Sequence, residues 1–378
     1  MKLVLDDEQE ALLVSVRNVL NAHCSPTQLA SAEESKSGLD DELWSTMVSA
    51  GWTAMSVPQT LDGLGTSLET TSNIVQEIGR FGCATPLVSG LQVGSILSSI
   101  NEDERAERLL RLLLDGHVVT YAGFFDTRIE LERQGGDYLA SADAVPVLWG
   151  HLAKAIVVVA KDSHGALSAH IVDVSDGVTL QTKMTLDNEH VGILNLARFN
   201  VGKPLVVFDH QGALDDWLAP FRVLQAALLT GCAQKLLEMT VEYMEVRKQF
   251  GRTLGSLPTV HQVLADVAIE VDGARLAVGE GAARLDRGLS AGRISSVASY
   301  WSGVVAQSTA LRVAQLHGAI GFMKEFPLQL FFRRAKAGQL RLGSLRTQQD
   351  LLARQLLPAV INSGAAIAMY GVEVDQGA

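Results

Sequence analysis

"VEYMEVRKQFGRTLGS", residues 241–256, begins with helical spacing and then changes character. Val241 and Met244 lie three residues apart among charged residues, as on the apolar side of a helix. A run of hydrogen-bond donors then leads to Phe250 and Gly251. One interpretation is that the donors complement the negative end of the helix and that Gly251 ends it. The other is an anion site, in which the arginine binds a phosphate and the aromatic ring stacks on a planar ligand.

A second glycine-containing stretch follows later in the chain, "QLHGAIGF" at residues 315–322. Gln315 stands near the predicted end of a helix, and Gly318 and Gly321 come after it. Small residues allow another backbone or a cofactor to approach closely, and a free helix terminus can receive a phosphate. The same pattern is also compatible with an ordinary helix–loop–helix connection.

Composition limits the classes of protein that fit. The chain has 378 residues, of which 47% are hydrophobic and 19% charged, so it can bury two or three domain cores. Its formal net charge is −11 and its pI is about 5.3, which argues against nucleic-acid binding because such binding needs a basic surface. A local basic site on an acidic protein can still hold an anionic ligand.

The cysteines and the apolar runs indicate a soluble cytoplasmic protein. Three widely separated cysteines, Cys24, Cys83 and Cys232, predict neither a metal site nor a disulfide framework, and they fit a reducing compartment. The N-terminal stretch "MKLVLDDEQEALL" lacks the apolar segment of a signal peptide. The longest apolar runs, such as "AIVVVA" at 155–160, are too short to cross a bilayer, so we expect no membrane partner.

The order of patterns along the chain predicts an α+β fold in three parts. Residues 1–115 have helical periodicity, with acids in first turns and glycines at the ends. Residues 116–214 contain short β-branched segments separated by turns such as "DSHG" and "SDG", which predicts an antiparallel β domain. Residues 215–378 contain four long helical segments joined by short loops, which predicts a four-helix bundle.

In this order the segments resemble the acyl-CoA dehydrogenase superfamily over essentially the whole chain. The family motif R-x-Q-F-G matches residues 247–251, and Q-x-x-G-G-x-G matches residues 315–321 with Ala319 in place of one glycine. "VPQTLDGLGTS" at 57–67 looks like the Pro…Gly-Gly-x-Gly loop of the family, with Asp62 in place of the first glycine. The resemblance implies a helical N-terminal domain, a middle β domain and a C-terminal bundle.

The resemblance also implies FAD as cofactor and an acyl-CoA as substrate. In this family a glutamate removes the α proton of the acyl-CoA, and the β hydrogen leaves as hydride to the flavin. The FAD lies between subunits. Six residues match those that contact the ADP part of a neighbouring subunit's FAD: Arg247, Gln249, Phe250, Gln315, Gly318 and Ala319.

The catalytic glutamate of the family is absent from both of its usual positions. "RRAKAGQLRLG" at 333–343 matches the family stretch R-D-A-K-x-x-x-I-Y-E-G, so that Leu342 stands at the glutamate. Other members carry the base early in the first bundle helix, where this chain has Phe221. Neither side chain accepts a proton. Five carboxylates lie near enough in the sequence to be candidates for a relocated base, although each also fits a helix cap, an ion pair or a solvated surface. They are Asp215, Asp216, Glu238, Asp266 and Glu325.

The segments that hold the flavin of a subunit's own site also depart from the family. The family's L-T-E-P segment is replaced by "YAGFFDT" at 121–127. Its W-I-T segment falls near "VPVLWGHLAK" at 145–154, where Trp149 is either a core residue or a flavin contact. The motif that in the family binds a neighbouring subunit's FAD is therefore retained, while the motifs that bind the flavin of the subunit's own site are not.

This asymmetry resembles one chain of the bacterial sterol-degrading acyl-CoA dehydrogenases, which are α2β2 heterotetramers in which only one of two related chains carries the glutamate. We therefore predict a non-catalytic subunit that completes FAD sites together with a homologous catalytic partner. The substrate of the assembled enzyme would be a bulky, steroid-like acyl-CoA. A homo-oligomer is the alternative assembly. Two other functions stay open: a self-sufficient flavoenzyme with a relocated base or monooxygenase chemistry, and a flavin-free structural homologue.

Overall fold

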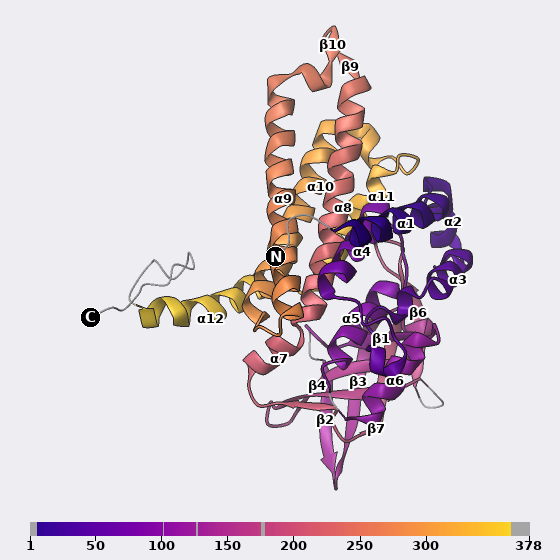
Figure 1. The fold of residues 1–378 in the computed structure, drawn as a ribbon, viewed down its shortest axis with the longest axis vertical. Coiled ribbons are helices and arrows are strands. Elements are labelled where there is room, and N and C mark those ends of the chain that lie inside the picture. The colour runs from indigo at the N-terminus through magenta and orange to yellow at the C-terminus, as the bar shows by residue number, and fades with distance from the viewer. Residues whose placement is uncertain (1–5, 101, 126–127, 175–177, 364–378) are drawn as a thin grey trace.

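The computed structural model describes residues 6–100, 102–125, 128–174 and 178–363, so the ends of the first and last predicted domains lie outside it. Helices come first, a sheet follows, and long helices complete the chain (Figure 1). The sheet and the N-terminal helices occupy one end of the molecule, and the bundle rises from them. The expected fold class is confirmed. None of the described helices is long and apolar enough to cross a membrane.

Six helices form the described N-terminal part, and several begin at the caps that the sequence offers. Asp6 accepts a hydrogen bond from the backbone of Gln9, whose side chain accepts one in return, and Ser25 and Gln28 repeat this arrangement. Gly82 ends the fourth helix in the left-handed conformation. The helices are α1 (Asp7–His23), α2 (Pro26–Glu34), α3 (Asp41–Ser49), α4 (Leu68–Phe81), α5 (Leu87–Leu97) and α6 (Glu104–Leu114).

Eight strands of the described chain form one mixed sheet, in the order β6-β7-β3-β2-β4-β5-β8 with β1 paired to β4. Most pairs are antiparallel, as expected, but β4 runs parallel to both β1 and β2. Helices α5 and α6 pack against β1. The strands are β1 (Val118–Ala122), β2 (Ile129–Gln134), β3 (Asp137–Leu148), β4 (Ala153–Asp162), β5 (Leu167–Asp173), β6 (Thr179–Met184), β7 (His190–Gly202) and β8 (Val206–Phe208).

The C-terminal part is a bundle around α8, which packs against α4, α9, α10 and α11. Helix α11 joins the bundle although the sequence did not single it out, while α12 projects from its base (Figure 1). A short hairpin, β9–β10, connects α8 to α9 at the far tip. The elements are α7 (Gln211–Trp217), α8 (Ala219–Val246), β9 (Lys248–Gln249), β10 (Arg252–Thr253), α9 (Pro258–Asp286), α10 (Gly292–His317), the 3₁₀ segment η5 (Gly318–Phe322), α11 (Leu328–Leu340) and α12 (Leu345–Ser363).

Two glycines set the close crossing of α4 and α8. A Cβ atom on Gly231 would lie 1.8 Å from the backbone oxygen of Gln76, and one on Gly79 would lie 2.1 Å from that of Leu228. No side chain fits in either place, so glycine is required by the distance between the two backbones. This crossing fixes the N-terminal helices on the bundle and thereby sets the position of the sheet.

A buried histidine predicts acid sensitivity of the sheet. His170 on β5 is 0% exposed, and its Nε2 lies 2.9 Å from Ser168 Oγ. Burial lowers the pKa of His170 from 6.5 to about 4. The unfolded chain therefore binds more protons than the folded chain between these values, and stability is lost as the pH falls through this window. We expect a loss of about 3 kcal/mol in the free energy of unfolding between pH 7 and pH 4.

Urea unfolding of the wild type and of His170→Gln at several pH values measures this contribution. The variant removes the titrating group, so its free energy of unfolding should fall less steeply with acid than that of the wild type. Parallel curves for the two proteins would show that His170 does not contribute.

Candidate functional site

The R-x-Q-F-G motif forms the tip of the bundle. Helix α8 ends at Val246, and Arg247 is already extended, with φ −72° and ψ 124°. Gln249 pairs with Arg252, which leaves Phe250 and Gly251 as a two-residue turn with φ of 55° and 73°. The interpretation in which Gly251 ends the helix is therefore wrong, because the glycine lies in the hairpin turn. Positive φ at both central residues suits the twist of a tight hairpin.

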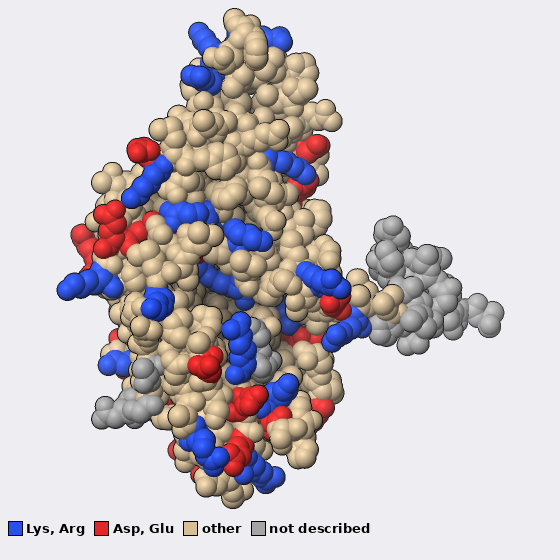
Figure 2. All heavy atoms as spheres, turned by 180° about the vertical axis from the view of Figure 1, so that it is seen from behind, with Lys and Arg blue, Asp and Glu red and all other residues tan. Residues whose placement is uncertain are grey.

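The side chains of Arg247, Lys248 and Arg252 at this tip are exposed. Arg247, Lys248 and Arg252 are absent from the ion pairs of the described residues, and Phe250 is 86% exposed. Figure 2 shows Lys and Arg at the top of the molecule with no acidic residue beside them on this face. Phenylalanine in a left-handed conformation costs about 1–2 kcal/mol. Exposed cations around a projecting aromatic ring form a surface suited to an anionic, partly aromatic ligand from outside the chain.

The second motif reaches the same end of the bundle. The imidazole of His317, at the end of α10, stacks on the ring of Tyr243 from α8 with the ring centroids 4.5 Å apart. Gly318 then has φ 65° and ψ −144°, a conformation that is essentially restricted to glycine. Gln315, Gly318 and Ala319 follow one another at this helix end, and Gly318 and Ala319 are exposed. The structure thus brings the six predicted FAD contacts to one end of the bundle, and their role in binding stays a prediction.

The two positions that the resemblance matches to the catalytic glutamate lie in the apolar core. Leu342 is 3% exposed and Phe221 is 0% exposed. The ring of Phe221 packs on those of Tyr121, Phe124 and Phe125, with centroids 4.5, 5.4 and 5.6 Å away. We call these four rings the aromatic cluster. It surrounds Phe221 with aromatic rings.

The five alternative carboxylates have structural roles or lie at the surface. Asp215 is buried and pairs with Arg222 at 2.8 Å. Glu238 pairs with Arg80 at 2.8 Å. Asp216 accepts a hydrogen bond from the backbone of Gly292 at 3.0 Å, at the start of α10. The remaining two are exposed: Asp266 and Glu325.

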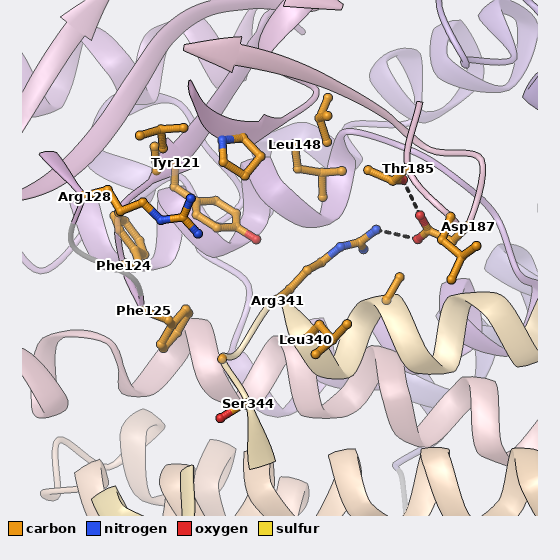
Figure 3. Close-up of a pocket in the computed structure, with 18 of the residues that line it drawn as sticks. Tyr121, Phe124, Phe125, Arg128, Leu148, Thr185, Asp187, Leu340, Arg341 and Ser344 are labelled. Atoms are coloured by element: carbon orange, nitrogen blue, oxygen red, sulfur yellow. Dashed lines mark hydrogen bonds and ion pairs between the residues drawn. The ribbon is translucent and has the colours of Figure 1, made fainter. Parts of the chain in front are cut away.

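A cavity of about 630 Å³ lies between the sheet and the junction of α11 with α12 (Figure 3). Its walls come from the end of β1 and the residues after it, from β3, from the β6–β7 turn and from residues 336–347. Pro146 and Leu148 line it, but Trp149 does not, since Trp149 is 1% exposed in the core of the sheet. Trp149 is therefore a core residue. Asp126 and Thr127 of the "YAGFFDT" segment lie outside the described residues.

Arg341 enters this cavity and forms a buried ion-pair cluster that the sequence did not suggest. Its Nη2 lies 2.8 Å from Asp187 Oδ2 and also contacts Glu189. Burial alone would lower the pKa of Arg341, but Glu189 and Asp187 raise it, so the guanidinium stays charged. We call these three residues the Arg341 cluster. It ties the end of α11 to the β6–β7 turn, next to Leu342.

The two other arginines of α11 extend this attachment. Arg333 and Arg334 contact the buried carboxylate of Glu33 on α2, at 3.4 and 3.2 Å. Asn188 of the β6–β7 turn donates to the same carboxylate at 2.7 Å. The basic stretch "RRAKAGQLR" is visible in the sequence. The ion pairs could not be predicted from it, because the acidic partners lie far away along the chain.

Comparison with known proteins identifies the class to which this fold and site belong. Residues 6–117 match the acyl-CoA dehydrogenase N-terminal domain, and residues 213–357 match the acyl-CoA dehydrogenase C-terminal domain. The chain belongs to the acyl-CoA dehydrogenase family.

Two similar proteins come from mycobacteria. Acyl-CoA dehydrogenase IpdE2 of Mycolicibacterium smegmatis is 26% identical over 346 residues, covering 91% of this chain and 97% of that protein. Acyl-CoA dehydrogenase FadE27 of Mycobacterium tuberculosis is 26% identical over 365 residues, covering 90% and 95%.

Two solved structures share the fold along nearly the whole chain. A variant of the Tcur3481-Tcur3483 steroid ACAD has a TM-score of 0.86 at 23% identity, covering 95% of this chain and 99% of that chain. The ChsE4-ChsE5 complex from Mycobacterium tuberculosis has a TM-score of 0.85 at 24% identity, covering 94% and 99%.

Proposed function

We propose that this chain is the non-catalytic subunit of a heteromeric, FAD-dependent acyl-CoA dehydrogenase. One contrast carries the proposal: the bundle tip presents exposed cations and Phe250 to an outside ligand, while both base positions are buried and apolar. The chain would help to bind FAD at a site completed by a homologous partner that supplies the glutamate.

The residues at the bundle tip fit the ADP part of FAD. The Arg247 guanidinium would donate paired hydrogen bonds to the pyrophosphate, and the Phe250 ring would stack on the adenine. Gln249, Gln315, Gly318 and Ala319 would complete this contact. When bound, FAD supplies the acceptor for the hydride that leaves the β carbon of the acyl-CoA. The part of this chain is to bind and orient the cofactor.

The cavity of this chain gives little support to a complete active site of its own. Among the described residues that line it, Asp187 is the sole carboxylate, and Arg341 and Thr185 both hold it by hydrogen bonds. Both of its oxygens are thus engaged in hydrogen bonds within the chain. The self-sufficient flavoenzyme is therefore the weaker alternative, and the exposed cations of the tip argue against a flavin-free homologue.

The names of the relatives support a heteromer and a steroid-like substrate. One similar structure is named a steroid ACAD, with two component names, and another is named a complex of two proteins. We propose an α2β2 heterotetramer in the cytoplasm that oxidises a bulky acyl-CoA such as a steroid fragment.

Flavin stoichiometry tests the proposal. FAD absorbance per chain is measured for this protein purified alone and after co-expression with a homologous chain that carries the glutamate. We expect little flavin alone and about one FAD per pair of chains in the complex. A full complement of FAD and dehydrogenase activity in the protein alone would refute the non-catalytic role.

A further inference from the structure

Two thiols that are far apart in the sequence meet in the N-terminal part of the molecule. Cys24 follows the last residue of α1, and its backbone N–H donates to the oxygen of Leu20 at 2.8 Å. Cys83 follows the glycine that ends α4, and its N–H donates to the oxygen of Ile78 at 3.2 Å. Since α1 packs against α4, the two thiols form a hydrogen bond with each other. Both are free thiols in the same core, so the fold brings two reduced sulfur atoms together.

The two cysteines differ in their access from outside. Cys24 lines a cavity of about 870 Å³, whose other walls include α2, one side of α8 and residues 324–333. Cys83 borders a space of about 20 Å³ inside the core. A small oxidant can therefore reach the sulfur of Cys24 from the larger cavity, while Cys83 is shielded behind it.

The hydrogen bond gives the two thiols different roles. The hydrogen bond to Cys24 and burial raise the pKa of Cys83. Cys83 therefore keeps its proton at neutral pH and donates it to the sulfur of Cys24. A hydrogen bond to sulfur favours the thiolate, which is the form that attacks an oxidant. Cys24 is thus the nucleophile of the pair.

A buried positive charge lies beside the pair. Two charged groups act on Cys83: Arg334 opposes the rise of its pKa, and the smaller effect of Asp40 adds to it. The Arg334 side chain is 9% exposed, and its Nη2 lies 3.2 Å from Glu33, a carboxylate that Arg333 also contacts. Two guanidinium groups share one carboxylate, so a net positive charge remains. This charge favours a thiolate at Cys83 once the hydrogen bond to Cys24 has been lost.

We propose that Cys24 and Cys83 form a reversible disulfide bond when a hydroperoxide oxidises Cys24. The Cys24 sulfur attacks one peroxide oxygen, the O–O bond breaks, and Cys24 becomes a sulfenic acid while water or an alcohol leaves. The Cys83 sulfur then attacks the Cys24 sulfur, the S–S bond forms, and the S–O bond breaks with release of water. The two thiols lose two electrons and two protons, which the peroxide and its products take up.

This modification site belongs to the chain itself and does not depend on the FAD role proposed above. The bond would join the α1–α2 turn to the connection between α4 and α5. A thiol reductant returns both residues to thiols by exchange, so the bond is reversible. In a reducing compartment such a bond forms transiently under oxidising conditions.

Thiol counting and peptide mapping test the proposal. The reduced full-length protein, in the assembly in which it purifies, is treated with hydrogen peroxide at neutral pH. Catalase then removes the peroxide, and N-ethylmaleimide in denaturant blocks the remaining thiols. Trypsin separates the three cysteines into peptides 18–36, 81–105 and 223–235.

We expect three blocked cysteines before the peroxide treatment and one after it, with peptide 18–36 linked to peptide 81–105 within one chain. Dithiothreitol should restore all three. The matched control is Cys232→Ser, which removes a buried thiol on α8 and should form the same link as the wild type. Three blocked cysteines after an exposure that oxidises free glutathione would overturn the proposal. A bond through Cys232, or between two copies of the chain, would also overturn it.

Two further variants test the order of the two steps. In Cys83→Ser the sulfenic acid at Cys24 has no thiol beside it, so dimedone, which reacts with sulfenic acids, should label Cys24. In Cys24→Ser we expect at least about tenfold less dimedone at Cys83, because that thiol is protonated and shielded. Equal or stronger labelling of Cys83 would overturn the assignment of Cys24 as the residue that is oxidised first. The wild-type link needs no substitution, so it remains a test if a variant fails to fold.

Discussion

Replacement of Arg341 by alanine is expected to lower the free energy of unfolding by about 3–5 kcal/mol. The substitution leaves two carboxylates without their counter-charge in the interior, since the side chains of Asp187 and Glu189 are 0% and 8% exposed. Burial already raises the pKa of Glu189, an effect that the Arg341 charge opposes. Urea unfolding at pH 7, followed by circular dichroism, measures the loss.

Two further variants separate the effect of the Arg341 cluster from that of losing any arginine. Arg275→Ala breaks an exposed pair with Asp272, in which the side chains are 55% and 67% exposed, and should change stability by less than about 1 kcal/mol. Adding Asp187→Asn and Glu189→Gln to Arg341→Ala should restore much of the loss, because no buried charge then remains unpaired. If Arg341→Ala is as stable as Arg275→Ala, the two carboxylates are not held by this guanidinium.

The second large effect concerns the bundle tip. Arg247→Ala in the assembled complex is expected to weaken FAD binding by about 10- to 100-fold, which corresponds to the loss of charge-assisted hydrogen bonds to a phosphate. Flavin absorbance per chain after gel filtration, together with titration of the stripped complex with FAD, measures the change. Phe250→Ala should give a loss of similar size, because the stacked ring is removed.

The matched control for this experiment is an arginine at the other end of the α8–α9 pair, away from the tip. Arg287 is an exposed arginine just after α9, far from the hairpin at which α9 begins, so Arg287→Ala removes one positive charge without touching the tip. Its flavin content should equal that of the wild type. Unchanged flavin in Arg247→Ala would remove the main support for assigning the motif to a cofactor.

Much of the fold could be predicted because its signals are local. The acids of the first turns, the glycine at residue 82 and the long periodic helices each depend on neighbours within a few residues. The parallel pairing of β4 with β1 and β2 could not be predicted, since it depends on which distant strands meet. Helix α11 was missed because its short apolar pattern is interrupted by arginines whose partners lie elsewhere.

The candidate site likewise contains residues that the sequence predicted and residues that only the structure shows. Leu342 was found from a motif in which the glutamate is missing, and Phe221 from the family's alternative base position in the first bundle helix. The structure adds that both side chains are buried. The Arg341 cluster was invisible in the sequence because its partners lie 154 and 152 residues away along the chain.

The tight hairpin at residues 250–251 has a consequence for how fast and how selectively the tip is recognised. Its two central residues are fixed by the turn itself, with φ of 55° and 73°, before any other molecule arrives. The conformational entropy of ordering this loop is therefore lost during folding and not during association. In the proposed role, the backbone that carries Phe250 is thus already ordered when the ligand arrives, which limits how far the tip can adapt to a surface of a different shape.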